Sequence, residues 1–255
     1  MITASALSPM NGVRHAFFTR EGGVSEGAFA SLNCGYGSGD DPDRVAANRA
    51  QAMGLLDAGD GALVTLHQVH SADVAVVEAP WPPGEAPTAD AAVTRRPGMA
   101  LGVLTADCAP VLMADAEAGV IGAAHAGWRG TLKGVIEAAV EAMCGLGAER
   151  GRIAAAIGPC IQQRSYEVGP ELRDRFVDAD AQDAVFFRDA PRDGRFLFDL
   201  SGHLGRRLRG LGVAVVERAP DDTCADEARF FSYRRALRAG ETDYGRGLAA
   251  IVLGG

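Results

Sequence analysis

The sequence predicts a fold of the mixed α/β (α+β) class. Segments typical of strands outnumber helical segments, and the two kinds interleave along the chain. Hydrophobic residues make up 47% and charged residues 23% of the 255 residues, which is the composition of a globular protein. A chain of this length can bury a substantial core, and we expect a single domain over residues 1–255.

Strands are predicted where short apolar segments are rich in β-branched residues. The predicted strands are residues 62–69, 73–78, 99–105, 110–114, 120–126, 152–157, 213–217 and 248–253. The segment 115–119 has the composition of a turn, so the strands on either side of it are expected to form a hairpin. Residues 80–87 contain four prolines, which exclude a helix or a central strand and indicate a surface loop.

The sequence predicts three helices. The first is expected over residues 41–53, because its Asp-Pro start supplies an N-cap and a first-turn proline. The second is expected to be capped by Thr131, with apolar residues at amphipathic spacing over residues 132–143 and Gly145 at the C-cap. The third follows Asp199, after which leucines recur every three or four residues.

The charge balance is acidic, with 25 Lys and Arg against 33 Asp and Glu, a net charge of −8. This argues against a nucleic acid polymer as partner, because neutralising phosphates requires a cationic surface. A small anion could still enter a local basic pocket. No apolar run reaches the roughly 18–20 residues of a membrane span, and the first 20 residues lack the pattern of a signal peptide. We therefore expect a cytoplasmic protein with no membrane partner, and we favour a monomer.

The chain has five His and five Cys, and any metal chemistry must use this short list. An odd number of Cys without a CxxC motif disfavours a disulfide framework and a zinc ribbon. Three unusual runs lie at or near the ends of predicted strands, where active sites are common. They are His-Gln-Val-His-Ser at 67–71, Thr-Ala-Asp-Cys-Ala-Pro at 105–110 and Ala-His-Ala-Gly-Trp-Arg-Gly at 124–130.

Cys108 and His125 are separated by about the length of one hairpin, so their strands could be neighbours with both side chains at one rim. Two His and one Cys form a recognised catalytic zinc set that leaves a fourth position open. Because side chains alternate along a strand, only one of His67 and His70 can easily join this pair, and the local pattern does not choose between them. The alternative interpretation is that these are buried polar residues satisfied by the backbone.

The three runs and several others resemble the signature of the YfiH family, the laccase-domain or polyphenol-oxidase-like proteins. The matching stretches are residues 18–25, 32–33, 48–49, 68–70, 106–112, 125–130, 157–161, 166–169 and 198–200. The resemblance implies packed mixed sheets flanked by helices, with a core similar to the catalytic domain of cytotoxic necrotizing factor. It also implies a zinc ion bound by His70, Cys108 and His125, which selects His70 over His67.

The family resemblance further implies phosphorolysis of purine nucleosides (adenosine, inosine and methylthioadenosine) and adenosine deamination. Phosphorolysis needs cations to hold phosphate, and the substrate-binding candidates are Arg129, Arg49 and Arg20. Deamination needs an activated water and a group that moves protons. Asp107 is the candidate for that group, although its position next to a ligand can turn its side chain away from the metal.

Other activities use the same residues. Cys108 could act as a nucleophile with His125 as base, which would make the protein a metal-free cysteine hydrolase of the peptidoglycan-editing type. Copper at the three-ligand site could support polyphenol oxidation, because His2Cys also resembles a blue-copper set. A multicopper centre is excluded by five His and no His-x-His motif. A purely structural zinc site would need a fourth protein ligand.

We predict a zinc-dependent purine nucleoside phosphorylase with accessory adenosine deaminase activity. Its partners would be a small purine nucleoside and phosphate. Cys108, His125 and Asp107 are the predicted catalytic residues, and copper is the alternative metal.

Overall fold

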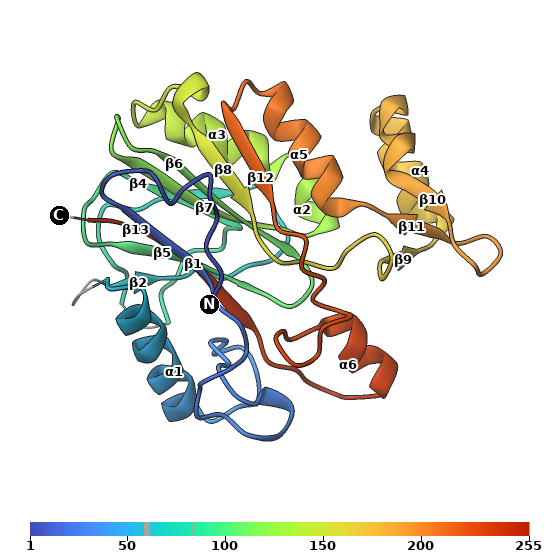
Figure 1. Cartoon of the computed structure of the whole chain (residues 1–255), viewed down its shortest axis with the longest axis horizontal. Coiled ribbons are helices and arrows are strands. Elements are labelled where there is room, and N and C mark those ends of the chain that lie inside the picture. Colours follow the sequence, from blue (N-terminus) through green and yellow to red (C-terminus); the bar gives the residue numbers. More distant parts are fainter. Residues whose placement is uncertain (59–61, 83, 255) are drawn as a thin grey trace.

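Two mixed β-sheets packed face to face form the centre of the protein (Figure 1). The computed structural model describes residues 1–58, 62–82 and 84–254. The six-stranded sheet has the order β12 (Val215–Arg218), β8 (Ala154–Ile157), β6 (Ala109–Asp115), β7 (Val120–Ala126), β4 (Ala91–Thr94) and β3 (Val74–Val76). The four-stranded sheet has the order β1 (Val13–Phe17), β13 (Gly247–Leu253), β5 (Ala100–Thr105) and β2 (Leu63–Val64).

Helices cover the outer face of each large sheet, and a small third sheet lies to one side (Figure 1). The helices are α1 (Pro42–Leu55), α2 (Trp128–Lys133), α3 (Val135–Gly145), α4 (Pro170–Ala179), α5 (Leu200–Gly210) and α6 (Tyr233–Ala239). The third sheet has the order β10 (Phe187–Asp189), β11 (Phe196–Phe198) and β9 (Glu167–Val168), and short 3-10 turns lie at Gly27–Phe29, Arg150–Arg152 and Ala181–Phe186. The architecture confirms the predicted class of mixed sheets flanked by helices.

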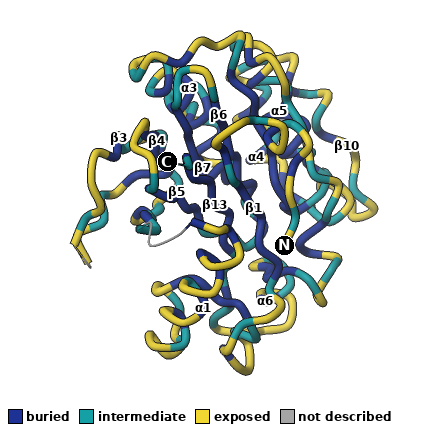
Figure 2. Tube along the Cα trace, turned by 60° about the vertical axis from the view of Figure 1, so that its left-hand side comes forward, coloured by how far each residue is buried: buried dark blue, intermediate teal, exposed yellow. Residues whose placement is uncertain are grey.

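The central strands are apolar at almost every position because both faces of their sheet are covered. Every residue of β6 and β7 is buried, as expected when both faces of a sheet are covered. Leu112 and Ala114 pack into the core shared by the two sheets, whereas Val111 and Met113 pack beneath α3 and α5. Figure 2 shows the central strands buried and the exposed residues concentrated on helices and loops around them.

The predicted hairpin and two of the predicted helix starts are confirmed. β6 and β7 pair antiparallel across the turn at residues 115–119. Asp41 caps α1 by accepting a hydrogen bond from the Asp43 N–H, and Pro42 follows as the first helical residue. Asp199 caps α5 through the Gly202 N–H. Among the described residues, no helix combines the length and the apolar character that crossing a membrane requires.

The predicted second helix is wrong in its boundaries. Thr131 lies inside α2, and Gly134, with φ of 90°, separates α2 from α3. Glycine tolerates this left-handed conformation, which lets the chain break into two helices without losing the amphipathic spacing. Gly145 is the last residue of α3, and Leu146 occupies the C-cap.

Other differences come from segments with weak local patterns. The predicted strand at 62–69 contributes only Leu63–Val64 to the sheet, and the chain then leaves the sheet. β1, β4, the small third sheet, α4 and α6 were not expected. They are short or polar, and they are stabilised by pairing and packing partners distant in sequence. Pro83 of the predicted loop at 80–87 lies outside the described residues.

Candidate metal centre

His70, Cys108 and His125 converge at one rim of the six-stranded sheet. Cys108 lies in the turn between β5 and β6, His125 lies near the end of β7, and His70 comes from the loop after β2. Pro110 is paired with His125 across the hairpin, which brings Cys108 beside it as the spacing predicts. One ligand atom from each of the three residues lies within 4.8 Å of the others. The Cys108 Sγ is 3.6 Å from the His70 Nε2.

A buried carboxylate, Asp90, holds two of these three residues. It lies immediately before β4 and is fully buried. Its Oδ1 is 2.8 Å from the His125 Nδ1, so this nitrogen is occupied and Nε2 is left for a metal. The same carboxylate accepts backbone N–H hydrogen bonds from Val69, His70 and Ser71 at 3.1, 2.9 and 2.6 Å. Asp90 therefore fixes both the ring of His125 and the loop that carries His70.

The loop needs this support because His70 has a φ of 60°, in the left-handed region that side chains other than glycine seldom adopt. Such a conformation costs of order 1–3 kcal/mol and persists when its surroundings impose it. The backbone hydrogen bonds to Asp90 supply that constraint. Gln68 anchors the start of the loop, because its side-chain amide both donates to and accepts from the backbone of Leu104 at 2.8 Å. His67 lines the neighbouring cavity but is not part of the ligand group.

Asp107, next to Cys108, is held in a comparable way. Its φ is 86°, and its buried carboxylate accepts hydrogen bonds from the Thr223 and Ser232 hydroxyls at 2.7 and 2.9 Å and from the Arg234 N–H at 2.6 Å. Burial raises the pKa of this carboxyl despite these hydrogen bonds. Because both oxygens are engaged by the protein, Asp107 positions the turn before Cys108. Its role in proton transfer stays a prediction.

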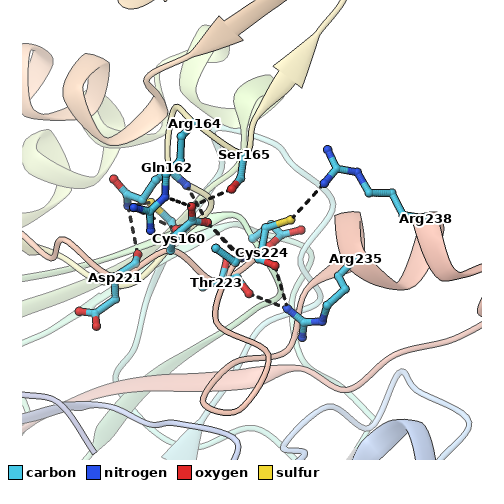
Figure 3. Close-up of polar contacts among 12 residues, drawn as sticks. Cys160, Gln162, Arg164, Ser165, Asp221, Thr223, Cys224, Arg235 and Arg238 are labelled. Atoms are coloured by element: carbon cyan, nitrogen blue, oxygen red, sulfur yellow. Dashed lines mark hydrogen bonds and ion pairs between the residues drawn. The ribbon is translucent and has the colours of Figure 1, made fainter. Parts of the chain in front are cut away.

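The loop that meets Asp107 is itself braced by polar contacts (Figure 3). The Arg235 guanidinium donates to the backbone carbonyls of Thr223 and Cys224 at 2.9 and 3.2 Å. The fully buried Cys160 belongs to this region, and burial raises the pKa of its thiol. A protonated buried thiol is unreactive, which favours a structural role for Cys160.

The donor set fits a tetrahedral metal ion. Zinc with bonds of about 2.3 Å to sulfur and about 2.0–2.1 Å to nitrogen would place those two ligand atoms about 3.6 Å apart. The separation of Cys108 Sγ and His70 Nε2 matches this value. Among the described residues, these three form the only group of three or more His, Cys, Asp or Glu ligands gathered closely enough to hold an ion. A metal held here would therefore keep an open coordination position.

The protonation states of Cys108 and His125 depend on each other. Burial opposes ionisation of the Cys108 thiol, but the charge and hydrogen bonds of His125 and His70 outweigh it and lower its pKa to about 6. Burial also opposes the charged form of His125, but Cys108 and Asp90 outweigh this and raise its pKa to about 9. Without metal, both shifts favour a thiolate beside an imidazolium.

Metal binding should consequently release protons in a predictable number. At pH 7.5 we expect release of about one proton, from His125, because Cys108 is already ionised. Below pH 6 the Cys108 thiol must also lose its proton, so release rises and affinity falls. Calorimetric titration of metal-free protein with zinc, in buffers of different ionisation enthalpy, measures this number. Absence of proton release at pH 7.5 would contradict the assigned states.

Gly127 leaves the space that the ligands occupy. A Cβ atom at this position would lie 2.6 Å from the His70 Cδ2 and 2.8 Å from the Cys108 Sγ. We expect Gly127→Ala to displace both ligands and to weaken zinc binding by roughly tenfold or more. Gly145→Ala is the control, since no atom lies within 4 Å of its added Cβ. Competition with a chromophoric chelator gives both affinities, and equal affinities would refute the role of Gly127.

The three ligands open into a cavity of about 640 Å³. Aromatic side chains and cations line this cavity around the metal site. They are Trp128, Tyr166, Tyr233 and Tyr244 together with Arg129, Arg234 and Arg246. Arg129 lines this cavity together with the three candidate ligands, and its role as a phosphate ligand stays a prediction. Arg234 and Arg246 come from distant segments and were not expected.

Arg49 and Arg20 do not line this cavity. The Arg49 Nε donates to the Cys34 carbonyl at 2.7 Å, and its guanidinium lies 4.3 Å from the centre of the Tyr36 ring. The Arg20 guanidinium lies 4.5 Å from the centre of the Phe231 ring. Both are engaged in contacts with the protein, and their roles as phosphate ligands stay predictions.

Sequence reasoning missed Asp90, Gly127, Arg234 and Arg246. Asp90 could have been identified as the single carboxylate inside the apolar run 89–93. A carboxylate that is buried with such a run needs hydrogen-bond or charged partners. Gly127 lies within a recognised motif, but its role depends on side chains from two other segments. Arg234 and Arg246 had no local signal.

The fold and the His2Cys group together define a class: mixed-sheet proteins that carry a candidate metal centre at one rim of the central sheet. The chain belongs to the family described as multi-copper polyphenol oxidoreductase laccase, whose sequence profile matches residues 14–254. A purine nucleoside phosphorylase of Streptomyces griseus is 44% identical over 243 residues, covering 94% of this chain and 96% of the relative.

Two solved structures are also similar to this chain over most of its length. A Neisseria meningitidis protein of family DUF152 has a TM-score of 0.85 and 35% identity, covering 96% of each chain. The Bacillus licheniformis protein YfiH has a TM-score of 0.85 and 28% identity, covering 95% of this chain and 93% of its own. The resemblance to the YfiH family is therefore confirmed.

Proposed function

We propose that this protein is a zinc-dependent purine nucleoside phosphorylase that also deaminates adenosine. The observation that carries the proposal is the His2Cys group opening into a cavity lined by both aromatic rings and arginines. The name of the Streptomyces griseus relative supports the same reaction class. All five cysteines are free, which supports the predicted cytoplasmic location.

The reaction requires two binding functions that the cavity can supply. In phosphorolysis the glycosidic C–N bond breaks, its electron pair passes to the base, which takes up a proton, and a C–O bond to phosphate forms. Aromatic rings such as Trp128 and Tyr166 can pack against a purine. One guanidinium group can donate two parallel hydrogen bonds to phosphate oxygens. Arg129 is the predicted phosphate contact that lines the cavity.

His70, Cys108 and His125 would hold the zinc ion, and Asp90 keeps His125 in the correct orientation. Bound zinc would supply Lewis acidity at its open position. The adenosine deaminase activity needs this chemistry together with a group that moves protons, for which Asp107 stays the candidate.

The test uses metal-analysed protein incubated with adenosine, with and without phosphate. Adenine and ribose 1-phosphate should appear only when phosphate is present, whereas inosine should appear without it. Chromatography of the products separates the two activities. If fully zinc-loaded protein turns over no purine nucleoside, the proposed function is wrong.

A cysteine hydrolase is the second candidate, because the lowered pKa of Cys108 and the raised pKa of His125 favour a thiolate–imidazolium pair. Zinc would bind the thiolate and prevent nucleophilic attack, so the two mechanisms exclude each other on one molecule. Metal analysis and alkylation of Cys108 distinguish them. Purified protein that lacks metal and alkylates readily at Cys108 favours the hydrolase. Copper with oxidation of a phenol would instead favour the polyphenol oxidase.

A further inference from the structure

A second cavity, of about 530 Å³, adjoins the cavity of the metal centre. The two share the side chains of Trp128, Arg129, Tyr166 and Arg234. The second cavity extends toward α4 and the connection between β10 and β11, which form the projection at the right of Figure 1. We call it the arginine cavity, because five arginines line it: Arg129, Arg175, Arg192, Arg195 and Arg234.

Few carboxylates neutralise this cluster. Arg192 forms an ion pair with Glu167. The Glu171 carboxylate lies against Gly169 at the start of its own helix, α4, where the helix dipole favours a negative charge.

Within residues 1–58, 62–82 and 84–254, the other four arginines form no ion pair. They are Arg129, Arg175, Arg195 and Arg234. The cavity lining thus has five arginines against two glutamates, Glu167 and Glu171, and an excess of like charges disfavours the folded state. In a chain with a net charge of −8, this local positive excess is best explained by an anionic ligand.

Packing against aromatic rings holds several of these arginines in place. The Arg129 and Arg175 guanidinium carbons lie 4.8 and 5.7 Å from the Trp128 ring. Arg234 lies 5.4 Å from the Tyr166 ring and donates a hydrogen bond of 2.6 Å to the Glu167 carbonyl. Guanidinium groups positioned in this way lose less freedom when they bind an anion, and their planar donors match phosphate oxygens.

We propose that the arginine cavity binds a phosphate group. The group is either inorganic phosphate or the phosphate ester of a purine nucleoside whose remaining atoms extend over Trp128 and Tyr166 toward the metal centre. Arg175 and Arg195 line only the arginine cavity, whereas Arg129, the phosphate contact of the proposed reaction, lines both cavities, so the free-phosphate alternative rests on the proposed function. Binding here requires no turnover, so a titration distinguishes failure of this inference from failure of the proposed function.

Isothermal titration of the metal-loaded protein with inorganic phosphate and with adenosine 5′-monophosphate tests the proposal. The double variant Arg175→Gln/Arg195→Gln should bind the probe about tenfold more weakly or worse, because two charge-assisted contacts are lost. The matched control is Arg95→Gln/Arg188→Gln, which removes the same charge from exposed positions outside both cavities. The control should bind as the wild type does.

The two probes identify the source of the phosphate. Weaker binding of inorganic phosphate alone assigns the site to free phosphate, and weaker binding of the nucleotide alone assigns it to the ester. When the double variant binds both probes more weakly, the probe that the wild type binds more tightly identifies the source. Equal affinity of the double variant and the wild type for both probes overturns the proposal. Equal losses in the double variant and the control also overturn it, as does absence of binding to the wild type at millimolar probe. Thermal unfolding confirms that each variant is folded.

Discussion

Replacing Cys108 with Ala is expected to remove both the metal and the turnover. Cys108 supplies the only sulfur of the ligand group and lies 3.6 Å from the His70 Nε2. Two histidines alone bind zinc weakly, so affinity should fall by more than the roughly 10–100-fold that the loss of an outer partner costs. Metal analysis after gel filtration and the adenosine assay measure the two effects.

Cys144→Ala provides the control for Cys108→Ala. Cys144 is a free, partly buried cysteine on α3 that lies outside the ligand group. The Cys144→Ala variant should keep both metal and activity. Retained metal and full turnover in Cys108→Ala would refute the site assignment, whereas retained metal with lost turnover would favour the cysteine nucleophile.

Asp90→Asn is expected to weaken zinc binding by about 10–100-fold, as the loss of an outer carboxylate partner does in other metal sites. An asparagine amide cannot accept on both sides, so its N–H2 group must face either the His125 ring and the His70 N–H or the N–H groups of Val69 and Ser71. The free energy of unfolding should also fall, by about 1–3 kcal/mol, because a buried donor is left without an acceptor.

Asp115→Asn separates the two effects of Asp90→Asn. Asp115 is also fully buried and accepts backbone hydrogen bonds, from Glu117, Ala118 and Glu149, but it lies at the opposite end of β6 from Cys108. The Asp115→Asn variant should be less stable than the wild type but should bind zinc with the same affinity. Urea unfolding and chelator competition measure the two quantities. Unchanged zinc affinity in Asp90→Asn would show that the carboxylate only stabilises the fold.

The pKa of Asp90 gives this residue a pH dependence of known sign. Burial opposes its ionisation, but hydrogen bonds from His125 and from the His70 loop outweigh burial and hold its pKa well below the ordinary value. Its contribution to stability is therefore present above about pH 4, the value in an unfolded chain, and is lost as the pH falls further.

The local sequence pattern predicted the class of fold because the long strands and the capped helices can be identified from their own residues. β6, β7 and β13 are long apolar strands, and the caps of α1 and α5 are formed by side chains adjacent to the helix. The same pattern misplaced the boundary at Gly134, because a left-handed residue between two amphipathic helices does not disturb their spacing.

The sequence alone determined that Cys108 and His125 could meet, because a hairpin connects them within 17 residues. The family resemblance added His70. Only the tertiary structure decided how the site is supported and lined: Asp90 beneath His125, Gly127 between the ligands, and the arginines of the two cavities. Hairpin geometry is set by local backbone periodicity, whereas loops from distant segments meet only when the sheets and helices pack.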